Sequence, residues 1–387
     1  MRALSPLVML VGLGLVALNL RPAVTSVGPL LQEIVQSLGF DRTEAGILTT
    51  LPVLCFGLIG PVAPVLGRRF GAENVIFAAL IAVAVACGMR LAPSAAMLYG
   101  SGVIAGLAIG LMNVLLPGIV KRDFPHKVGA VTGFYTMMLC VGAAGAAALA
   151  PQVELAFGVT WTVALAIWGI LALLALPAWA PLRAHFHSAP QTATAETRSL
   201  WTSALAWQVT IYLGLASSLA YSVFGWGAKI LQDRGMDVPS SGLMLGLSIL
   251  VQGGGALVAP LMTVKGGDLR LSALLMLALG LAGLLGYLFA PIGTMGLWSV
   301  LLGLGQGGAF AIALTMIAQR GGNPQTAARL SGMTQSVGYV MGALAGPLAV
   351  GLVHDLAGGW PPVAILFCVI TAGAAICALG AGRVRTV

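Results

Sequence analysis

The chain has 387 residues, of which 59% are apolar and only 8% charged. Soluble domains carry about 25% charged residues, so this composition excludes an ordinary soluble enzyme or scaffold and predicts a chain that contacts lipid. The formal net charge of +8 would suggest a nucleic-acid partner in a soluble protein. Here we expect no nucleic acid, because in a membrane protein the positions of the charges report the topology instead.

Twelve apolar segments are long enough to cross a bilayer, since a spanning helix needs about 20 mostly apolar residues. Charge clusters and Gly/Pro punctuation separate them. In chain order we predict spans at 5–30, 43–67, 74–91, 95–120, 128–151, 158–179, 201–231, 240–264, 270–290, 294–319, 326–353 and 361–382. The sequence therefore predicts an all-α membrane protein with twelve transmembrane helices.

Lysine and arginine set the orientation of these spans. With the N-terminus inside, fourteen of the 19 Lys and Arg fall on the cytoplasmic side, and four (Arg42, Arg90, Lys229 and Arg234) fall on the outer side. Cytoplasmic loops carry the excess of positive charge. We therefore predict a multi-pass protein of a bacterial-type inner (plasma) membrane, with both termini in the cytoplasm.

A polar stretch divides the spans into two sets of six. It runs from 181 to 199, contains His185 and His187, and reads as a cytoplasmic linker. The residues on either side, 1–180 and 200–387, are expected to form two six-helix bundles. Gly106 and Gly133 recur at an offset of 199 as Gly305 and Gly332, which suggests a parallel repeat of the two halves.

Metal and cofactor sites are not expected. The two linker histidines have no third ligand nearby, and the five cysteines lie in apolar runs with no metal-ligand spacing. An enzyme is not expected either. Ser101 is a candidate nucleophile in its span, but no His lies at matching depth, and neither H-E-x-x-H nor Walker A motifs occur. A channel is the remaining alternative of another class.

Arg21 is the single charge that falls clearly inside a span. Such a charge costs about 2.5–3.5 kcal/mol to insert, so it is usually functional or paired. The functional hypothesis is that Arg21 faces a cavity and binds the anionic or electron-rich part of a substrate; the structural alternative is that it bonds helix carbonyls and amide side chains. Pro22 breaks the helix beside it and frees carbonyls, and Thr25 lies on the same helical face.

Other polar and aromatic groups recur on single helical faces at mid-span. Tyr221 follows this spacing in the seventh span, and Gln306 and Phe310 follow it in the tenth. Asn113 lies in the fourth span and Tyr339 in the eleventh. These residues are candidates for cavity lining, with helix packing as the alternative interpretation.

No carboxylate or histidine lies clearly at mid-span, so the sequence assigns no proton relay. Exchange, uniport and coupling through protonation of the substrate all stay open. A proton is thus one candidate partner of transport, beside the small-molecule substrate and the lipid bilayer.

The loop after the second span resembles the signature of the major facilitator superfamily, G-x-L-A-D-R-x-G-R-R. The stretch Gly60-Pro61-Val62-Ala63-Pro64-Val65-Leu66-Gly67-Arg68-Arg69 keeps both Gly and both Arg, but Pro64 replaces the Asp that helps to lock the two halves in the family. The resemblance implies two pseudo-symmetric bundles, a monomer, and a cavity lined by spans one, four, seven and ten.

Within that superfamily the chain resembles the CynX/NimT (cyanate and 2-nitroimidazole transporter) branch. The resemblance rests on the stretches 18–22 with 28–31, 48–52, 113–118 running into 121–126, 206–210 and 330–339, of which all but the first are closer to the nitroimidazole type. It implies a carrier of a small, polar, electron-rich molecule. A 2-nitroimidazole-type exporter is the leading interpretation, and a cyanate-type small-anion transporter is the alternative.

We therefore predict a secondary transporter with Arg21 as the substrate anchor. The other expected substrate-binding residues are Thr25, Asn113, Tyr221, Gln306 and Phe310; those expected to serve loops and gating are Gly60, Gly67, Arg68, Arg69, Lys121 and Arg122. Small residues permit close helix packing, and Gly142, Gly145, Gly342 and Gly346 are expected to do this between the two halves.

Overall fold

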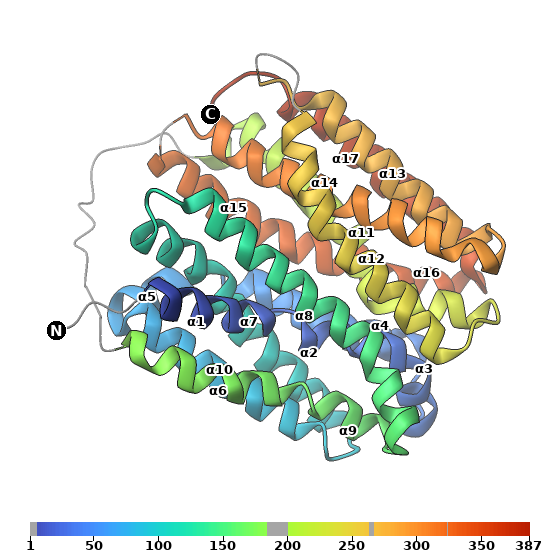
Figure 1. The fold of residues 1–387 in the computed structure, drawn as a ribbon. Helices are drawn as coiled ribbons and strands as arrows, with labels where there is room; N and C mark the ends of the chain where they lie inside the picture. Colours follow the sequence, from blue (N-terminus) through green and yellow to red (C-terminus); the bar gives the residue numbers. More distant parts are fainter. Residues whose placement is uncertain (1–5, 184–199, 263–266, 323) are drawn as a thin grey trace.

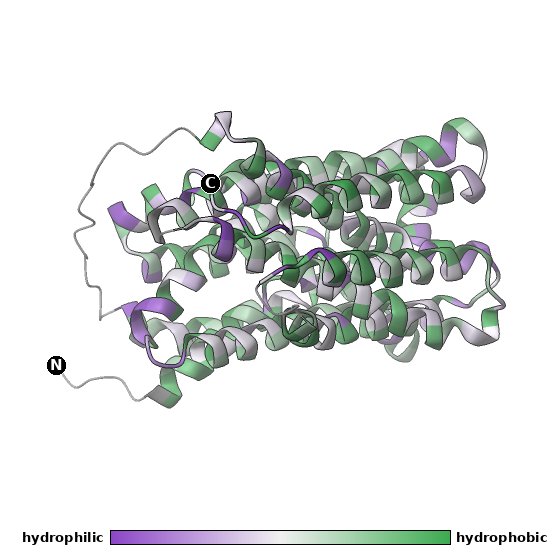
Figure 2. Cartoon of the chain, turned by 90° about the horizontal axis from the view of Figure 1, so that it is seen from above, coloured by the Kyte–Doolittle hydropathy of each residue, from purple (hydrophilic) through white to green (hydrophobic). Residues whose placement is uncertain are grey.

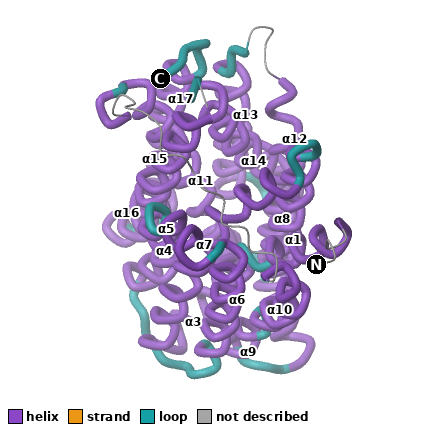
Figure 3. The backbone as a smooth tube through the Cα atoms, turned by 90° about the vertical axis from the view of Figure 1, so that its left-hand side faces the viewer, coloured by secondary structure: helices purple, strands orange, loops and turns teal. Residues whose placement is uncertain are grey.

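The computed structural model describes residues 6–183, 200–262, 267–322 and 324–387, and its regular elements are helices that run roughly side by side (Figures 1 and 3). Eleven helical stretches are long and apolar enough to cross a membrane, and one bent pair of helices brings the number to twelve. Hydrophilic residues gather at the two ends of the helix assembly (Figure 2). The prediction of an all-helical membrane protein is confirmed.

The first set of helices, which we call the N group, extends from α1 to α10. Its bounds are α1 (Pro6–Leu18), α2 (Pro22–Thr25), α3 (Val27–Leu38), α4 (Arg42–Ile59), α5 (Ala63–Phe70), α6 (Ala72–Met89), α7 (Ala95–Asp123), α8 (Val128–Phe157), α9 (Trp161–Ala166) and α10 (Gly169–Arg183).

The second set, the C group, contains seven α-helices and four short turns or bulges. Its bounds are η1 (Leu200–Thr202), α11 (Ala204–Asp233), α12 (Val238–Val258), η2 (Ala259–Met262), α13 (Arg270–Phe289), η3 (Ile292–Thr294), α14 (Met295–Arg320), α15 (Pro324–Ala343), the π-helical η4 (Leu344–Leu348), α16 (Ala349–Ala357) and α17 (Trp360–Ala381).

Several helices differ from the segments that hydropathy predicts. The first span continues to Leu38 rather than residue 30, because a helix satisfies its own backbone even where Gln32 and Glu33 make it polar. The second span bends by 60° between α4 and α5, so the signature stretch forms a helix of its own. Pro64 lies in the first turn of α5, where a missing N–H costs nothing.

The predicted linker is shorter at its start than expected, because α10 continues to Arg183. The rest of it, 184–199 with His185 and His187, lies outside the described residues.

The main contacts of the seam between the two groups are those of α8 with α12, of α4 with α15, η4 and α16, and of α3 with α11. Of all the spans, α11 is the most enclosed: 83% of the residues in its most apolar stretch are buried. The helices α7 and α14 pack extensively only within their own groups. The seam is therefore carried by a subset of helices, and α11 lies at its centre.

Polar contacts across the seam gather at the end of the molecule where α3 meets α4, opposite to the C-terminus. We call this the far end and the other the terminal end. Three hydrogen bonds cross the seam there: Lys229 Nζ to Gln32 Oε1 (3.1 Å), Gln232 Nε2 to the Pro29 carbonyl (2.9 Å), and Thr43 Oγ1 to Asp355 Oδ2 (3.2 Å).

The glycines expected to join the halves pack inside the groups instead. A Cβ at Gly142 would lie 2.3 Å from the Leu18 carbonyl oxygen, and one at Gly346 would lie 2.5 Å from that of Ser218. Gly342 also faces α11, while a Cβ at Gly145 would meet nothing within 4 Å. The expectation of close packing holds for three of these glycines, but the partner helix was wrong, since it belongs to the same group.

Other glycines make the approach across the seam. A Cβ at Gly28 would lie 2.2 Å from the Phe224 carbonyl oxygen, and one at Gly225 would lie 2.9 Å from the Cβ of Thr49. Along α4, a Cβ at Gly57 would lie 2.6 Å from the Ser336 carbonyl oxygen. Sequence alone does not separate these positions from glycines within a group, because both lie in apolar helices.

Candidate functional site

The first span is interrupted in its middle. Helix α1 ends at Leu18, and Arg21 takes a non-helical conformation (φ −135°, ψ −29°) directly before Pro22 starts α2. The Arg21 carbonyl accepts hydrogen bonds from the Val24 and Thr25 amides at 2.8 and 3.0 Å. The break thus places a guanidinium where helix geometry would not direct it.

Side chains of the N group hold this break in place. Asn19 donates from Nδ2 to the Leu171 carbonyl at 3.1 Å, and Thr25 donates from Oγ1 to the Ala143 carbonyl at 2.9 Å. The Thr25 hydroxyl also lies 3.3 Å from the Arg21 carbonyl, and its side chain is fully buried. Thr25 therefore contacts the backbone of Arg21, and the structure does not bring its hydroxyl to the guanidinium.

The guanidinium of Arg21 lies among aromatic rings from both groups. Its Nη1 donates to the Tyr221 hydroxyl at 3.2 Å. Its Cζ lies 5.5 Å from the ring centre of Tyr221 and 5.6 Å from that of Phe56, both within cation–π range. Tyr339 extends the cluster, with its ring centre 6.2 Å from that of Tyr221. Phe56 belongs to the N group, and the two tyrosines belong to the C group.

Among the described residues, no carboxylate balances the positive charge of Arg21. Its side chain is 8% exposed, and the ionisable groups that interact with it in the described part of the chain are Tyr221, Tyr339 and Cys140. An unpaired buried charge is costly, and in a membrane protein it marks a candidate site for an ion or a substrate. This arrangement can bind an anion or an electron-rich group of a small molecule.

The contact between Arg21 and Tyr221 joins the two groups. The two residues are 200 positions apart, and Tyr221 lies on α11, which packs against α2, α3 and α4 of the N group. Arg21 and Tyr221 therefore lie at the junction where the two groups meet.

The remaining predicted lining residues lie elsewhere on the central helices. Gln306 uses both ends of its amide within the C group: Nε2 donates to the Leu219 carbonyl and Oε1 accepts from Gln252 Nε2, each at 3.2 Å. Asn113 on α7 and Phe310 on α14 are half-buried. The structure thus brings Tyr221 to Arg21 and shows no contact of Gln306, Asn113 or Phe310 with it among the described residues.

The signature residues occupy the terminal end. Arg68 and Arg69 are exposed in the last turn of α5, where cations interact favourably with the helix dipole. A Cβ at Gly60 would lie 2.6 Å from Ser336 Oγ of the C group, and one at Gly67 would lie 2.8 Å from a Leu115 methyl carbon. Gly60 therefore faces the seam, whereas Gly67 faces α7.

Arg122 is an internal clamp of the N group. It donates to Glu73 Oε1 at 2.5 Å and to both Asp123 oxygens at 2.5 and 2.8 Å. Glu73 is 2% exposed, so this pair fastens the end of α7 to the start of α6. Lys121 beside it is exposed. No contact of Arg122 with the C group is present in the described ranges.

Two residues of the site escaped sequence reasoning. Phe56 carries no signal that separates it from a lipid-facing ring. Arg90 was counted on the outer side, at the end of the predicted span 74–91, and its burial was not predicted: it is 2% exposed and donates from Nη2 to the Ala23 carbonyl at 2.7 Å. It follows the last residue of α6, and hydropathy places such a charge at the interface although neighbouring helices cover it. The signal was present in the lack of a nearby acidic residue in the sequence.

Comparison with known proteins agrees with this architecture. The family model of the Major Facilitator Superfamily matches residues 13–345. The 2-nitroimidazole transporter of Escherichia coli (strain K12) is 38% identical over 380 residues, with 97% of this chain and 96% of that protein covered. The cyanate transport protein CynX of the same organism is 32% identical over 354 residues, with 91% of each covered. The crystal structure of a point mutant of the nucleoside transporter NupG has a TM-score of 0.77 at 14% identity and covers 96% of this chain and 98% of that chain; it supports the fold.

Proposed function

The chain belongs to the CynX/NimT family of the major facilitator superfamily, and we propose that it moves a small anionic or electron-rich solute across the inner membrane by alternating access. The observation that carries this proposal is Arg21, a guanidinium at the junction of the two groups that has no carboxylate partner among the described residues. Its five N–H donors form a planar fork that suits carboxylate, cyanate or nitro oxygens.

The N group (α1 to α10) and the C group (η1 to α17) act as the two bundles that rock about this site. With both termini in the cytoplasm, the far end is the outer side. The hydrogen bonds and glycine contacts at that end support a state closed to the outside. Rocking breaks these contacts, withdraws Tyr221 from Arg21, and presents the site to the other side.

The leading substrate class is the 2-nitroimidazoles, and the direction is export. Similarity to the 2-nitroimidazole transporter over almost the full chain supports this choice. A nitro group accepts both arms of the Arg21 fork, and the rings of Tyr221 and Phe56 are placed to stack on a heteroaromatic ring. Cyanate is the second candidate, supported by the relationship to the cyanate transport protein and by a single positive charge at the site.

Coupling to a proton is part of the same proposal. The carboxylates of the described residues do not contact Arg21. The proton would therefore cross the membrane either bound to the substrate or in exchange for it. The carrier would act as a monomer, because each chain contains both halves of the site.

The test is transport of labelled 2-nitroimidazole and labelled cyanate in proteoliposomes that contain the wild type, Arg21→Ala or Arg21→Lys. Loss of the fork is expected to lower kcat/KM about 30-fold in Arg21→Ala, since a hydrogen bond to a charged group is worth ~2 kcal/mol. Arg21→Lys keeps the charge and is expected to recover part of the rate. Movement of cyanate alone would replace the nitroimidazole assignment. Transport by correctly folded Arg21→Ala at the wild-type rate would overturn the anchor role.

A further inference from the structure

A second buried guanidinium, that of Arg90, lines a pocket to which Tyr221 also contributes. Arg90 donates from Nη2 to the Ala23 carbonyl at 2.7 Å and from Nε to Ser101 Oγ at 3.1 Å. Its Nη1 is buried and has no hydrogen-bond partner in the part of the chain that the structure describes. No ion pair of Arg90 with a carboxylate is found there either.

A purely structural arginine in the same chain looks different. Arg320 is equally buried, at 2% exposed, and caps helix ends in the C group. Its Nε donates to the Ala381 carbonyl, its Nη1 to Gln319 Oε1, and its Nη2 to the Gly267 and Gly382 carbonyls. All three nitrogens of Arg320 are used, whereas Arg90 has one arm left. Since leaving a buried donor unsatisfied is costly, the free Nη1 of Arg90 favours a partner that the described residues do not supply.

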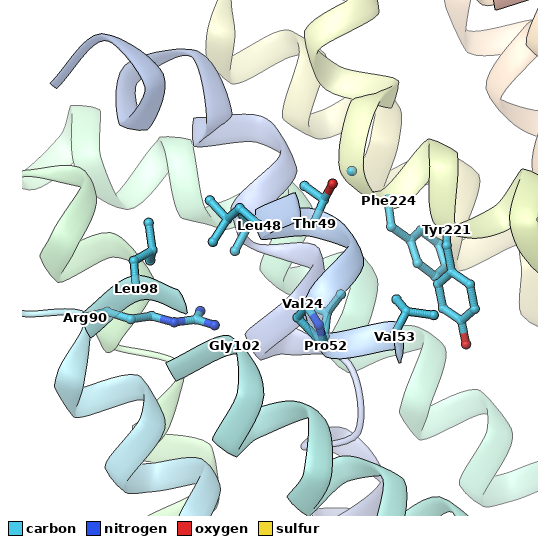
Figure 4. A pocket seen from close by; sticks show the side chains of 12 residues that line it. Val24, Leu48, Thr49, Pro52, Val53, Arg90, Leu98, Gly102, Tyr221 and Phe224 are labelled. Atoms are coloured by element: carbon cyan, nitrogen blue, oxygen red, sulfur yellow. The ribbon is translucent and has the colours of Figure 1, made fainter. Parts of the chain in front are cut away.

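The free arm belongs to the wall of a small pocket. Apolar residues of α2, α3, α4 and α7 form three sides of it, among them Val24, Pro52 and Gly102. Figure 4 shows the Arg90 guanidinium directed toward Val24 and Pro52, with Phe224 and Tyr221 on the opposite side. The free space inside is about 10 Å³, close to what one water molecule needs. In this closed state the pocket therefore holds no more than one water-sized group.

The fourth side of the pocket comes from the other group. Tyr221, Phe224 and Gly225 of α11 close it, while the remaining lining residues belong to the N group. The same Tyr221 accepts the hydrogen bond from Arg21. Tyr221 therefore contacts Arg21 and also lines the pocket that holds Arg90. If the far end opens, α11 moves away, the pocket widens, and Arg90 and Arg21 face one space.

We propose that Arg90 and its pocket form an anion-binding subsite on the far side of Arg21, with Tyr221 lining the pocket and contacting Arg21 in the closed state. This inference rests on the proposed transport function and adds a second site to it. The ligand is a single small anion, either an inorganic ion such as chloride or the anionic end of the transported solute. A positive charge without a carboxylate in an apolar wall selects for negative charge.

The experiment measures binding of cyanate and of chloride to the purified protein by calorimetry, with gluconate as the background anion. Arg90→Met is expected to raise the Kd of cyanate at least tenfold. Arg320→Met is the matched control: it removes a buried capping guanidinium as well, and it is expected to lower thermal stability while the Kd stays within a factor of two of the wild type.

Gly102→Ala tests the pocket without touching Arg90. A Cβ there would lie 3.6 Å from the nearest atom, Pro52 Cγ, so the variant is expected to fold. Because the methyl group fills the pocket, we expect the Kd of cyanate to rise about fivefold. A purely structural Arg90 predicts no change in this variant, which keeps the proposal testable if Arg90→Met does not fold.

Competition between chloride and cyanate identifies which kind of anion the subsite binds. Chloride that binds the wild type and competes with cyanate identifies an inorganic-ion site, and cyanate that binds without chloride competition identifies the anionic end of the solute; both support the subsite. Wild-type affinity for cyanate in folded Gly102→Ala and Arg90→Met, or no anion binding to the wild type, would overturn it. If either of these outcomes overturns the subsite while Arg21→Ala still loses transport, the transport proposal stands.

Discussion

The two halves of the first span have nearly the same length and different partners. Helix α1 packs against α8 and α10 of its own group, whereas α3 packs across the seam against α11. Arg21 lies at the boundary between them. One span thus has a half that stays fixed within its bundle and a half that forms a separable contact, and the break at Arg21–Pro22 allows these halves to differ.

The separable half is held by weak interactions. The hydrogen bonds from Lys229 to Gln32 and from Gln232 to Pro29 are each worth about 0.5–1.5 kcal/mol. A contact this weak can open and close, because a ligand can shift a conformational equilibrium of only a few kcal/mol. Clamps such as Arg122–Glu73 lie within a group and need not break during rocking.

Among variants that test the difference between α1 and α3, Gly28→Ala in α3 is expected to change the population of the closed far end the most. The new methyl group would lie 2.2 Å from the Phe224 carbonyl oxygen, and a backbone atom cannot move aside cheaply. Overpacking costs about 1–3 kcal/mol, so the closed far end should lose roughly 5- to 150-fold in population. Spin labels at the exposed Ser37 and Leu356, in a cysteine-free background, should move apart.

Gly12→Ala in α1 is the matched control. Its methyl group would lie 3.3 Å from the Ala178 carbonyl oxygen, inside the N group. A small change in thermal stability and an unchanged Ser37–Leu356 distance are expected. Equal label distances in Gly28→Ala and Gly12→Ala would show that the two halves of the first span do not differ as described.

A smaller effect is expected from Lys229→Met at the far end. The change removes the hydrogen bond across the seam to Gln32 and should weaken the closed state by ~0.5–1 kcal/mol, a two- to fivefold shift in population. Asp233→Asn serves as the control, because Asp233 contacts Lys229 and Trp360 within the C group. The same spin-label pair measures both variants. A shift in Asp233→Asn as large as in Lys229→Met would assign the effect to the ion pair and not to the seam.

The smallest effect is expected from Asp268→Asn at the terminal end. The Arg270 guanidinium donates to Asp268 at 2.7–3.2 Å and holds the pKa of that carboxyl below its usual range. A lowered folded-state pKa stabilises the protein above the unfolded value, near 3.9, and this contribution is lost as the pH falls through the folded value.

Wild type should therefore be slightly more stable than Asp268→Asn at pH 7, as is typical of an exposed pair, and the two should converge as the pH falls through the lowered folded-state pKa of Asp268. Thermal unfolding at several pH values measures this. The Ser37–Leu356 distance should not change, because the pair lies within the C group. A stability difference that persists at the lowest pH would contradict the role assigned to the Arg270 contact.

Much of the fold could be predicted from the sequence, because apolar length and charge position act locally. The spans ending near Met89 and Phe289 fall within a residue or two of the hydropathy segments. The end of the first span could not be predicted in the same way. Gln32 and Glu33 make α3 polar, and hydropathy cannot distinguish a polar helix from a loop.

The candidate site likewise has a part that could be predicted from the sequence and a part that could not. Arg21 stands out in the sequence because a mid-span charge has a high energetic cost wherever the chain folds. Its partners are a tertiary matter: Tyr221 is 200 residues away, Phe56 has no distinguishing local pattern, and Arg90 is buried only because α4 and α7 cover it. The sequence by itself determined that a transporter-like bundle with one costly charge would form. Only the packing of the two groups decided which side chains surround that charge, because contacts between distant helices depend on geometry that no local pattern contains.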